Sequence, residues 1–276
     1  SGSAVVYHTQ HGNSLATQQQ GRHSSQPPRP VTDVEEAKGA KRTLRRLWGA
    51  RVGNRERMLG WRLYHGRLPS NLYRASFPGA GVSPYCTHPE CMQHGQQRTQ
   101  RQHPVASISH LFLECPAYQP AREWLADTWH AITGTRPPLN GAVLLGDWDA
   151  AWDSYPAGDA QDLWTVLRLT WLLALWDTHN SPNASERTSH RVVAATVVAL
   201  SRLMRAAFCR CDPGPQIFDP MPVSVLTRPV RQITVEKFNS SWGYGGVLGR
   251  AEMRPDGKPE LQVYLSMHHP VPAPAQ

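Results

Sequence analysis

Apolar side chains recur every three or four residues along much of this chain, and this spacing predicts α-helices with one buried face. The most apolar stretch, 159–180, is hydrophobic nearly all round, which is typical of a helix at the centre of a core. The periodic stretch 185–208 follows after a short turn, so the two should form an antiparallel helical hairpin. Further helices should begin after Asp33 and span 55–64, 71–76 and 116–133.

The pattern changes near the carboxyl end, where apolar and polar residues alternate over short stretches. This alternation predicts strands over 232–238, 242–248 and 261–265, the last two joined by a Pro-Asp-Gly-Lys turn at 255–258. An apolar island at 143–146 predicts one more short strand. We therefore expect a mainly α fold, a helical bundle with a small antiparallel β element near the carboxyl terminus.

Local composition divides the chain into segments of different character. The two ends are polar and rich in proline, and a run of prolines separates the helical region from the predicted strands. The predicted segments are a disordered or extended arm over 1–32, a zinc-stabilised helical domain over 33–211, a Pro-rich linker over 212–230, a β-rich segment over 231–267 and a tail over 268–276.

Net charge narrows the choice of partner. The 276 residues carry a formal charge of +8, which favours a polyanion such as nucleic acid. No apolar run is long enough to span a membrane, so we expect no membrane partner.

The candidate chemistry is concentrated in one polar, turn-rich stretch. Cys86 and Cys91 form a C-x4-C pair, and His110 and Cys115 form an H-x4-C pair in an apolar run. Three thiolates and one imidazole fill the tetrahedral shell of a structural Zn²⁺, so the fold should include one zinc knuckle. Zinc binding would add its free energy to the folding of this stretch.

Other assignments of these residues stay open. One of three further histidines, His88, His94 or His103, can replace a ligand, or the cysteines can be buried without metal. Five cysteines in metal-like spacing indicate a reducing intracellular compartment, either nucleus or mitochondrion. Cys209 and Cys211 are expected to be helix-end residues with no metal role.

Basic residues gather in two regions that can contact phosphates. The alternative is that each run is only the solvated face of a packed helix. The candidate nucleic-acid-binding residues are Lys38, Lys41, Arg42, Arg45, Arg46, Arg51, Arg55 and Arg57 in the first region and Arg187, Arg191, Arg202 and Arg205 in the second.

The sequence contains no recognisable arrangement of catalytic residues. No phosphate-binding glycine loop or Ser/His/Asp arrangement can be read from it, so we expect a protein that is not an enzyme. A zinc hydrolase is a weaker hypothesis, because four protein ligands leave no open position for water.

The stretch from Leu47 to Trp129 resembles a known family. It contains W-R-L-Y-H-G-R-L-P-S from Trp61, the cysteine pair, H-L-F-L-E-C-P from His110 and then Trp124. These motifs are similar to the zinc-binding region downstream of the polymerase domain in non-LTR (LINE-type) retrotransposon reverse transcriptases. The family's first pair is usually C-x2-C, and the Asp-Asp pair of its polymerase site does not occur here in a strand-turn-strand context.

The resemblance implies two functions. The first is a zinc-stabilised helical module that binds nucleic acid, RNA in preference to DNA. The second is a domesticated derivative that serves as a structural RNA-binding subunit of a large ribonucleoprotein, such as an organellar ribosome, beside other protein subunits.

Overall fold

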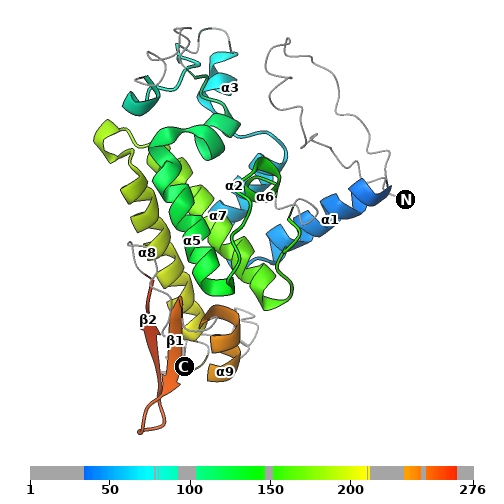
Figure 1. The fold of residues 1–276 in the computed structure, drawn as a ribbon, viewed down its shortest axis with the longest axis vertical. Helices are drawn as coiled ribbons and strands as arrows, with labels where there is room; N and C mark the ends of the chain where they lie inside the picture. Colours follow the sequence, from blue (N-terminus) through cyan, green and yellow to red (C-terminus); the bar gives the residue numbers. More distant parts are fainter. Residues whose placement is uncertain are drawn as a thin grey trace, which may run out of the picture.

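The computed structural model describes residues 34–77, 79, 81–92, 104–146, 152–209, 211, 233–243 and 247–265. This part of the chain is mostly helical, with a two-stranded antiparallel sheet near its carboxyl end (Figure 1), so the expected fold class is confirmed. The predicted arm, linker and tail lie outside the described residues. The main elements are α1 (Val34–Gly49), α2 (Asn54–Tyr64), α3 (Asn71–Ala75), α5 (Gln119–Thr133), α6 (Gly141–Leu144), α7 (Asp159–His179), α8 (Ser189–Phe208), α9 (Val235–Phe238), β1 (Gly249–Met253) and β2 (Pro259–Val263).

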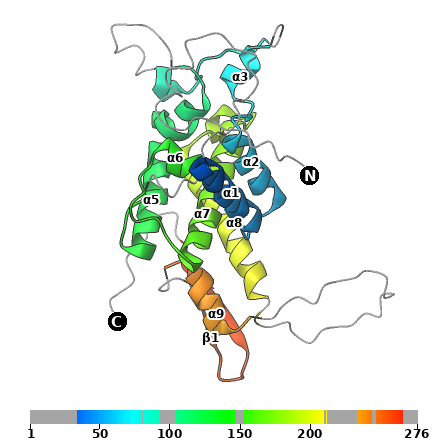
Figure 2. The same cartoon turned by 90° about the vertical axis from the view of Figure 1, so that its right-hand side faces the viewer.

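Helix α7 runs through the middle of the bundle and contacts α2, α5 and α8 (Figure 1, Figure 2). Leu169, Trp171 and Leu172 are fully buried although they point in different directions around the helix, as expected for a central core helix. The Trp171 indole N–H donates a hydrogen bond to the carbonyl of Ala121 at 3.1 Å, which joins α7 to α5. None of the described helices combines the length and apolarity that a membrane crossing requires.

Trp129, Trp152 and Trp164 form a cluster of aromatic rings in the core. Trp164 of α7 lies 5.2 Å from Trp129 of α5 and 5.4 Å from Trp152, ring centroid to ring centroid, in edge-to-face geometry. Such pairs add to the burial of large apolar surfaces. Trp152 therefore anchors the loop before α7 to the core.

The β element is a hairpin at the end of the bundle opposite α3 (Figure 1). Strands β1 and β2 pair in antiparallel register from Gly249 opposite Val263 to Met253 opposite Pro259. Its inner side packs on the bundle, because Leu248 and Ala251 belong to the same hydrophobic cluster as α8.

Three predicted strands are wrong. In the first, at 232–238, the Thr234 hydroxyl accepts the N–H of Lys237 and starts α9, a single helical turn. One turn buries positions i and i+3, so the apolar alternation around Phe238 also fits a helix.

The other two strands fail for similar reasons. Within 242–248, the described residues 242–243 belong to the π-turn Asn239–Gly243, residues 247–248 form a turn and a bend, and strand pairing begins at Gly249. The island at 143–146 forms α6, because the Asn140 side chain accepts the N–H of Val143 at 2.9 Å. The strand near 261–265 and its turn are confirmed as β2 and the loop before it.

The packing makes one direct prediction. Trp171→Ala should lower the free energy of unfolding by about 3–5 kcal/mol, because it leaves a cavity and removes the hydrogen bond to α5. Trp48→Ala is the matched control: Trp48 is 52% exposed, and its loss should change stability by less than about 0.5 kcal/mol. Urea unfolding of both variants measures the difference. Equal costs would contradict the central position of α7.

Candidate metal centre

A short antiparallel bridge positions the first ligand. Tyr85 pairs with Val105, and the Cys86 N–H donates to the carbonyl of Pro104 at 2.8 Å. The Ala106 N–H in turn donates to the carbonyl of Pro84 at 2.7 Å. These bonds join the two arms that flank the undescribed residues 93–103, and they hold Cys86 in the interior at 4% exposure.

The second ligand follows one helical turn later. Residues 89–92 are helical, and the Met92 N–H donates to the carbonyl of His88 at 3.1 Å. This turn places Cys91 inside, with 1% exposure, beside Cys86. The C-x4-C spacing thus becomes an extended residue followed by a single turn.

A π-turn carries the other two ligands. His110–Glu114 is a π-helical segment in which the Cys115 N–H donates to the carbonyl of His110 at 2.6 Å. The Ser107 hydroxyl accepts the His110 N–H at 3.0 Å and fixes where the turn starts. Residues five apart lie one above the other only in this wider turn, so it brings both ligands to one side.

The four side chains meet in one small buried space. Their ligating atoms all lie within 4.8 Å of one another. The Cys91 sulfur is 3.5 Å from the His110 Nε2 and 3.5 Å from the Cys115 sulfur. Sulfurs on a tetrahedral Zn²⁺ stand roughly 3.5–4 Å apart, given Zn–S bonds of about 2.3 Å. The group can hold one metal ion.

Electrostatics favour a cation at this place. Contacts with the Cys115 and Cys86 sulfurs, together with burial, raise the pKa of the Cys91 thiol. The contact with Cys86 and burial raise the pKa of Cys115 to about 12. Hydrogen bonds from Cys115 and Cys91 lower the pKa of the Cys86 thiol. A bound divalent cation would stabilise the other two thiolates.

Neighbouring polar groups support the ligand loops. The buried Arg122 guanidinium of α5 donates to the carbonyl of Cys115 at 2.9 Å. The Ser189 hydroxyl at the start of α8 donates to the carbonyl of Ala117 at 2.6 Å. The ligand segment is therefore attached to both helices by hydrogen bonds as well as by packing.

A histidine that could replace a ligand lies apart from the group. His88 Nε2 is 2.7 Å from the carbonyl of Arg187, and His88 is not among the clustered ligands. Its ring contacts Tyr118, which in turn contacts His179. Burial lowers the pKa of His179 to about 4. The other two candidates, His94 and His103, lie outside the described residues.

Sequence reasoning did not identify these supporting residues. Tyr118 and Arg122 are buried, and His179 is partly buried, where α5 and α7 pack beneath the ligand loops. A buried arginine that bonds a carbonyl looks like any surface arginine in a sequence pattern, so no signal marked them.

Three of the arginines predicted to contact phosphates instead contact other groups of the protein. Arg46 lies over the Tyr155 ring and bonds its hydroxyl, and Arg55 pairs with Asp177 at 3.0 Å. Arg57 donates to the carbonyl of Ala50 at 2.9 Å. Arg46 thus joins α1 to the loop before α7, Arg55 joins α2 to α7, and Arg57 joins α2 to the α1–α2 turn.

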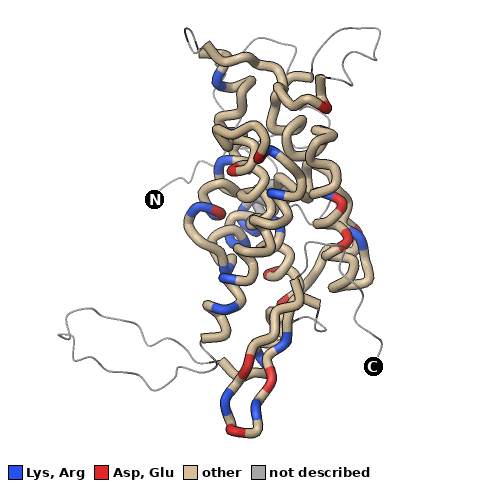
Figure 3. The backbone as a smooth tube through the Cα atoms, turned by 90° about the vertical axis from the view of Figure 1, so that its left-hand side faces the viewer, with Lys and Arg blue, Asp and Glu red and all other residues tan. Residues whose placement is uncertain are grey.

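Two further arginines of the candidate nucleic-acid-binding set also contact groups within the protein. Arg51 faces Asp162 at 4.0 Å, and Arg187 donates two hydrogen bonds to the carbonyl of Ser181. The side chain of Lys38 lies outside the described part of the chain. The remaining candidates are exposed: Lys41, Arg42 and Arg45 on α1, and Arg191, Arg202 and Arg205 on α8. Figure 3 shows that Lys and Arg positions are spread along much of the described backbone.

Comparison with known proteins adds no relative. No protein-family model matches the chain, and neither a curated protein nor a solved structure matches it. The likeness of 47–129 to the reverse-transcriptase zinc region stays a prediction from the quoted motifs.

The ligand set predicts the metal content of the purified protein. Wild type should carry one metal ion per chain, and Cys91→Ser should bind it at least roughly 100-fold more weakly, because losing a ligand exceeds the effect of losing an outer partner. Cys209→Ser is the matched control, since Cys209 is exposed and outside the group. Elemental analysis after dialysis against a chelator measures both. Equal metal retention by the two variants would contradict the assignment.

Proposed function

We propose that this protein is a non-catalytic nucleic-acid-binding module, held in shape by one structural zinc ion, with RNA as its ligand. The observation that carries the proposal is an arginine stripe along α8 that no acidic residue of the helix interrupts. Each part of the proposal has its own support.

Zinc is the metal that the ligand types favour. Thiolates and imidazole in a tetrahedral set of four are typical of structural Zn²⁺, whereas Mg²⁺ and Ca²⁺ prefer oxygen. The four residues are all buried and would complete the shell, so water would have no open position. This supports a structural metal and a non-catalytic module.

The α8 stripe consists of Arg191, Val198, Arg202 and Arg205, all exposed. Their spacing of 7, 4 and 3 residues places them on one face of the helix. None of the three arginines takes part in an ion pair that the described residues form, in contrast to Arg55 and Arg51. Guanidinium groups without carboxylate partners suit phosphate contacts.

The opposite side of α8 explains why the stripe is rigid. Val192, Thr196, Leu200 and Met204 are buried against the bundle. The Thr188 hydroxyl caps the helix by accepting the N–H of Arg191 at 3.2 Å. The arginines therefore project from a fixed backbone, which lowers the entropy lost when they order on a phosphate chain.

RNA is preferred to DNA because both hypotheses implied by the reverse-transcriptase resemblance act on RNA. The contacts on α8 would be to phosphates, so binding would depend little on sequence and strongly on salt.

The salt dependence of binding to a single-stranded RNA tests this proposal. Replacing Arg191, Arg202 and Arg205 together by Ala should flatten the slope of log K against log salt by about 2, since each phosphate contact on a single strand contributes about 0.7. Fluorescence anisotropy with a labelled oligonucleotide measures the slope, and competition with the same sequence as DNA measures the preference for RNA.

The control removes the same charge from side chains that already have carboxylate partners. Arg136, Arg250 and Arg254 pair with Glu123, Glu252 and Glu260, respectively, and all three are changed to Ala. Their slope should change by less than about 0.7. If both triple variants flatten the slope equally, only net charge matters and the stripe is not the binding face.

A further inference from the structure

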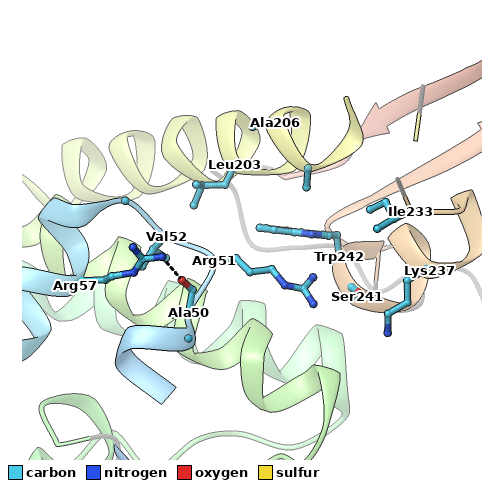
Figure 4. A pocket seen from close by; sticks show the side chains of 13 residues that line it. Ala50, Arg51, Val52, Arg57, Leu203, Ala206, Ile233, Lys237, Ser241 and Trp242 are labelled. Atoms are coloured by element: carbon cyan, nitrogen blue, oxygen red, sulfur yellow. Dashed lines mark hydrogen bonds between the residues drawn. The ribbon is translucent and has the colours of Figure 1, made fainter. Parts of the chain in front are cut away.

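A pocket of about 530 Å³ lies where the α1–α2 turn, the end of α8 and the α9 segment meet (Figure 4). Its volume falls within the range of about 300–1,000 Å³ that is typical of small-molecule sites. The walls come from residues 49–57, 203–207 and 233–242, so only the fold brings them together.

One part of the lining is apolar. Val52 and Trp242 are buried at 6% and 3% exposure, and they share the pocket with Leu203, Ala207 and Ile233. This surface fits the flat, weakly polar body of a ligand better than it fits a hydrated ion.

The other part is cationic. Arg51, Arg57 and Lys237 line the pocket, and none of the described lining residues is Asp or Glu. Figure 4 shows Arg51 extending from the α1–α2 turn toward Ser241 and Lys237. The same pocket therefore offers positive charge beside its apolar wall.

The nearby carboxylates form only weak ion pairs with Arg51 and Lys237. Arg51 is 4.0 Å from Asp162, and Lys237 is 2.9 Å from Asp159, with all four side chains between 35% and 55% exposed. Ion pairs at this exposure contribute little, so an incoming anion can share the cations.

Two buried polar atoms in the lining are left without a hydrogen-bond partner. They are the hydroxyl of Ser241, a residue only 5% exposed, and the Nε of Arg57. Buried polar groups normally find a partner, and a ligand with acceptor oxygens would supply one here.

We propose that this pocket holds one nucleotide of a single-stranded nucleic acid, with its base against the Trp242 and Leu203 side and its phosphate between Arg51 and Lys237. The polymer part rests on the proposed function. Ala206 at the rim follows Arg205 on α8, so the stripe leads directly to the pocket. An apolar protein side chain would bring no anionic group to the three cations, which is why we favour a nucleotide.

Isothermal titration of the full chain with AMP, adenosine and inorganic phosphate tests the pocket without any polymer. AMP should bind about tenfold more tightly than either adenosine or phosphate, because it alone uses both parts of the lining. Arg51→Gln should weaken AMP binding about tenfold and leave adenosine unchanged.

A matched pair of variants locates the binding. Ala206→Phe fills the rim of the pocket without changing charge and should weaken AMP binding at least about tenfold. Ala184→Phe is the control, because Ala184 is also exposed but lies in the 3-10 turn Ala184–Glu186, which precedes the opposite end of α8. Thermal unfolding of both variants confirms that each is folded.

The outcomes separate this inference from the proposed function. Absence of AMP binding, equal affinity for AMP and phosphate, or equal binding by the two Phe variants would overturn the pocket assignment, whatever the RNA slope shows. AMP binding that depends on Ala206, in a protein whose RNA binding ignores the α8 stripe, would support the pocket and overturn the proposed function.

Discussion

Three cysteine sulfurs and one imidazole meet inside this protein with their ligating atoms within 4.8 Å of one another. Placing three thiols so close in a buried space raises the pKa of Cys91 and Cys115, and a bound cation would stabilise their thiolates. The backbone that carries them consists of a β-bridge, a helical turn and a π-turn, and hydrogen bonds join it to α5 and α8. A metal ion bound by this group would therefore be the constraint on which this end of the structure depends.

The ligand loops are also hydrogen-bonded to α5 and to the residues just before α8, the helix that carries the proposed function. Arg122 joins the Cys115 loop to α5, and the carbonyl of Arg187 accepts a hydrogen bond from His88 just before α8 begins. Helix α8 then runs the length of the bundle, and its last turns line the Trp242 pocket. One rigid helix thus connects the metal centre, the arginine stripe and the pocket.

The sequence predicted features that depend on local residue order better than features that depend on contacts between residues far apart in the chain. Helical periodicity placed α7 and α8 closely, because their buried faces follow from residue order alone. Ligand types identified Cys86, Cys91, His110 and Cys115, although the π-turn that joins the last two was not foreseen. Alternation failed around Phe238, because Val235 and Phe238 lie on one side of a single helical turn and so short a stretch does not separate helical spacing from strand spacing. The density of basic residues along the sequence did not distinguish Arg57, which donates a hydrogen bond to a carbonyl, from Arg205, which is exposed to solvent.

X-ray absorption at the zinc edge of the purified protein tests the central claim most directly, because it identifies the metal and its ligands together. The account predicts a four-coordinate site with three sulfurs at about 2.3 Å and one nitrogen at about 2.0 Å. A shell dominated by oxygen or nitrogen, or a protein that binds no zinc when it is supplied, would contradict it.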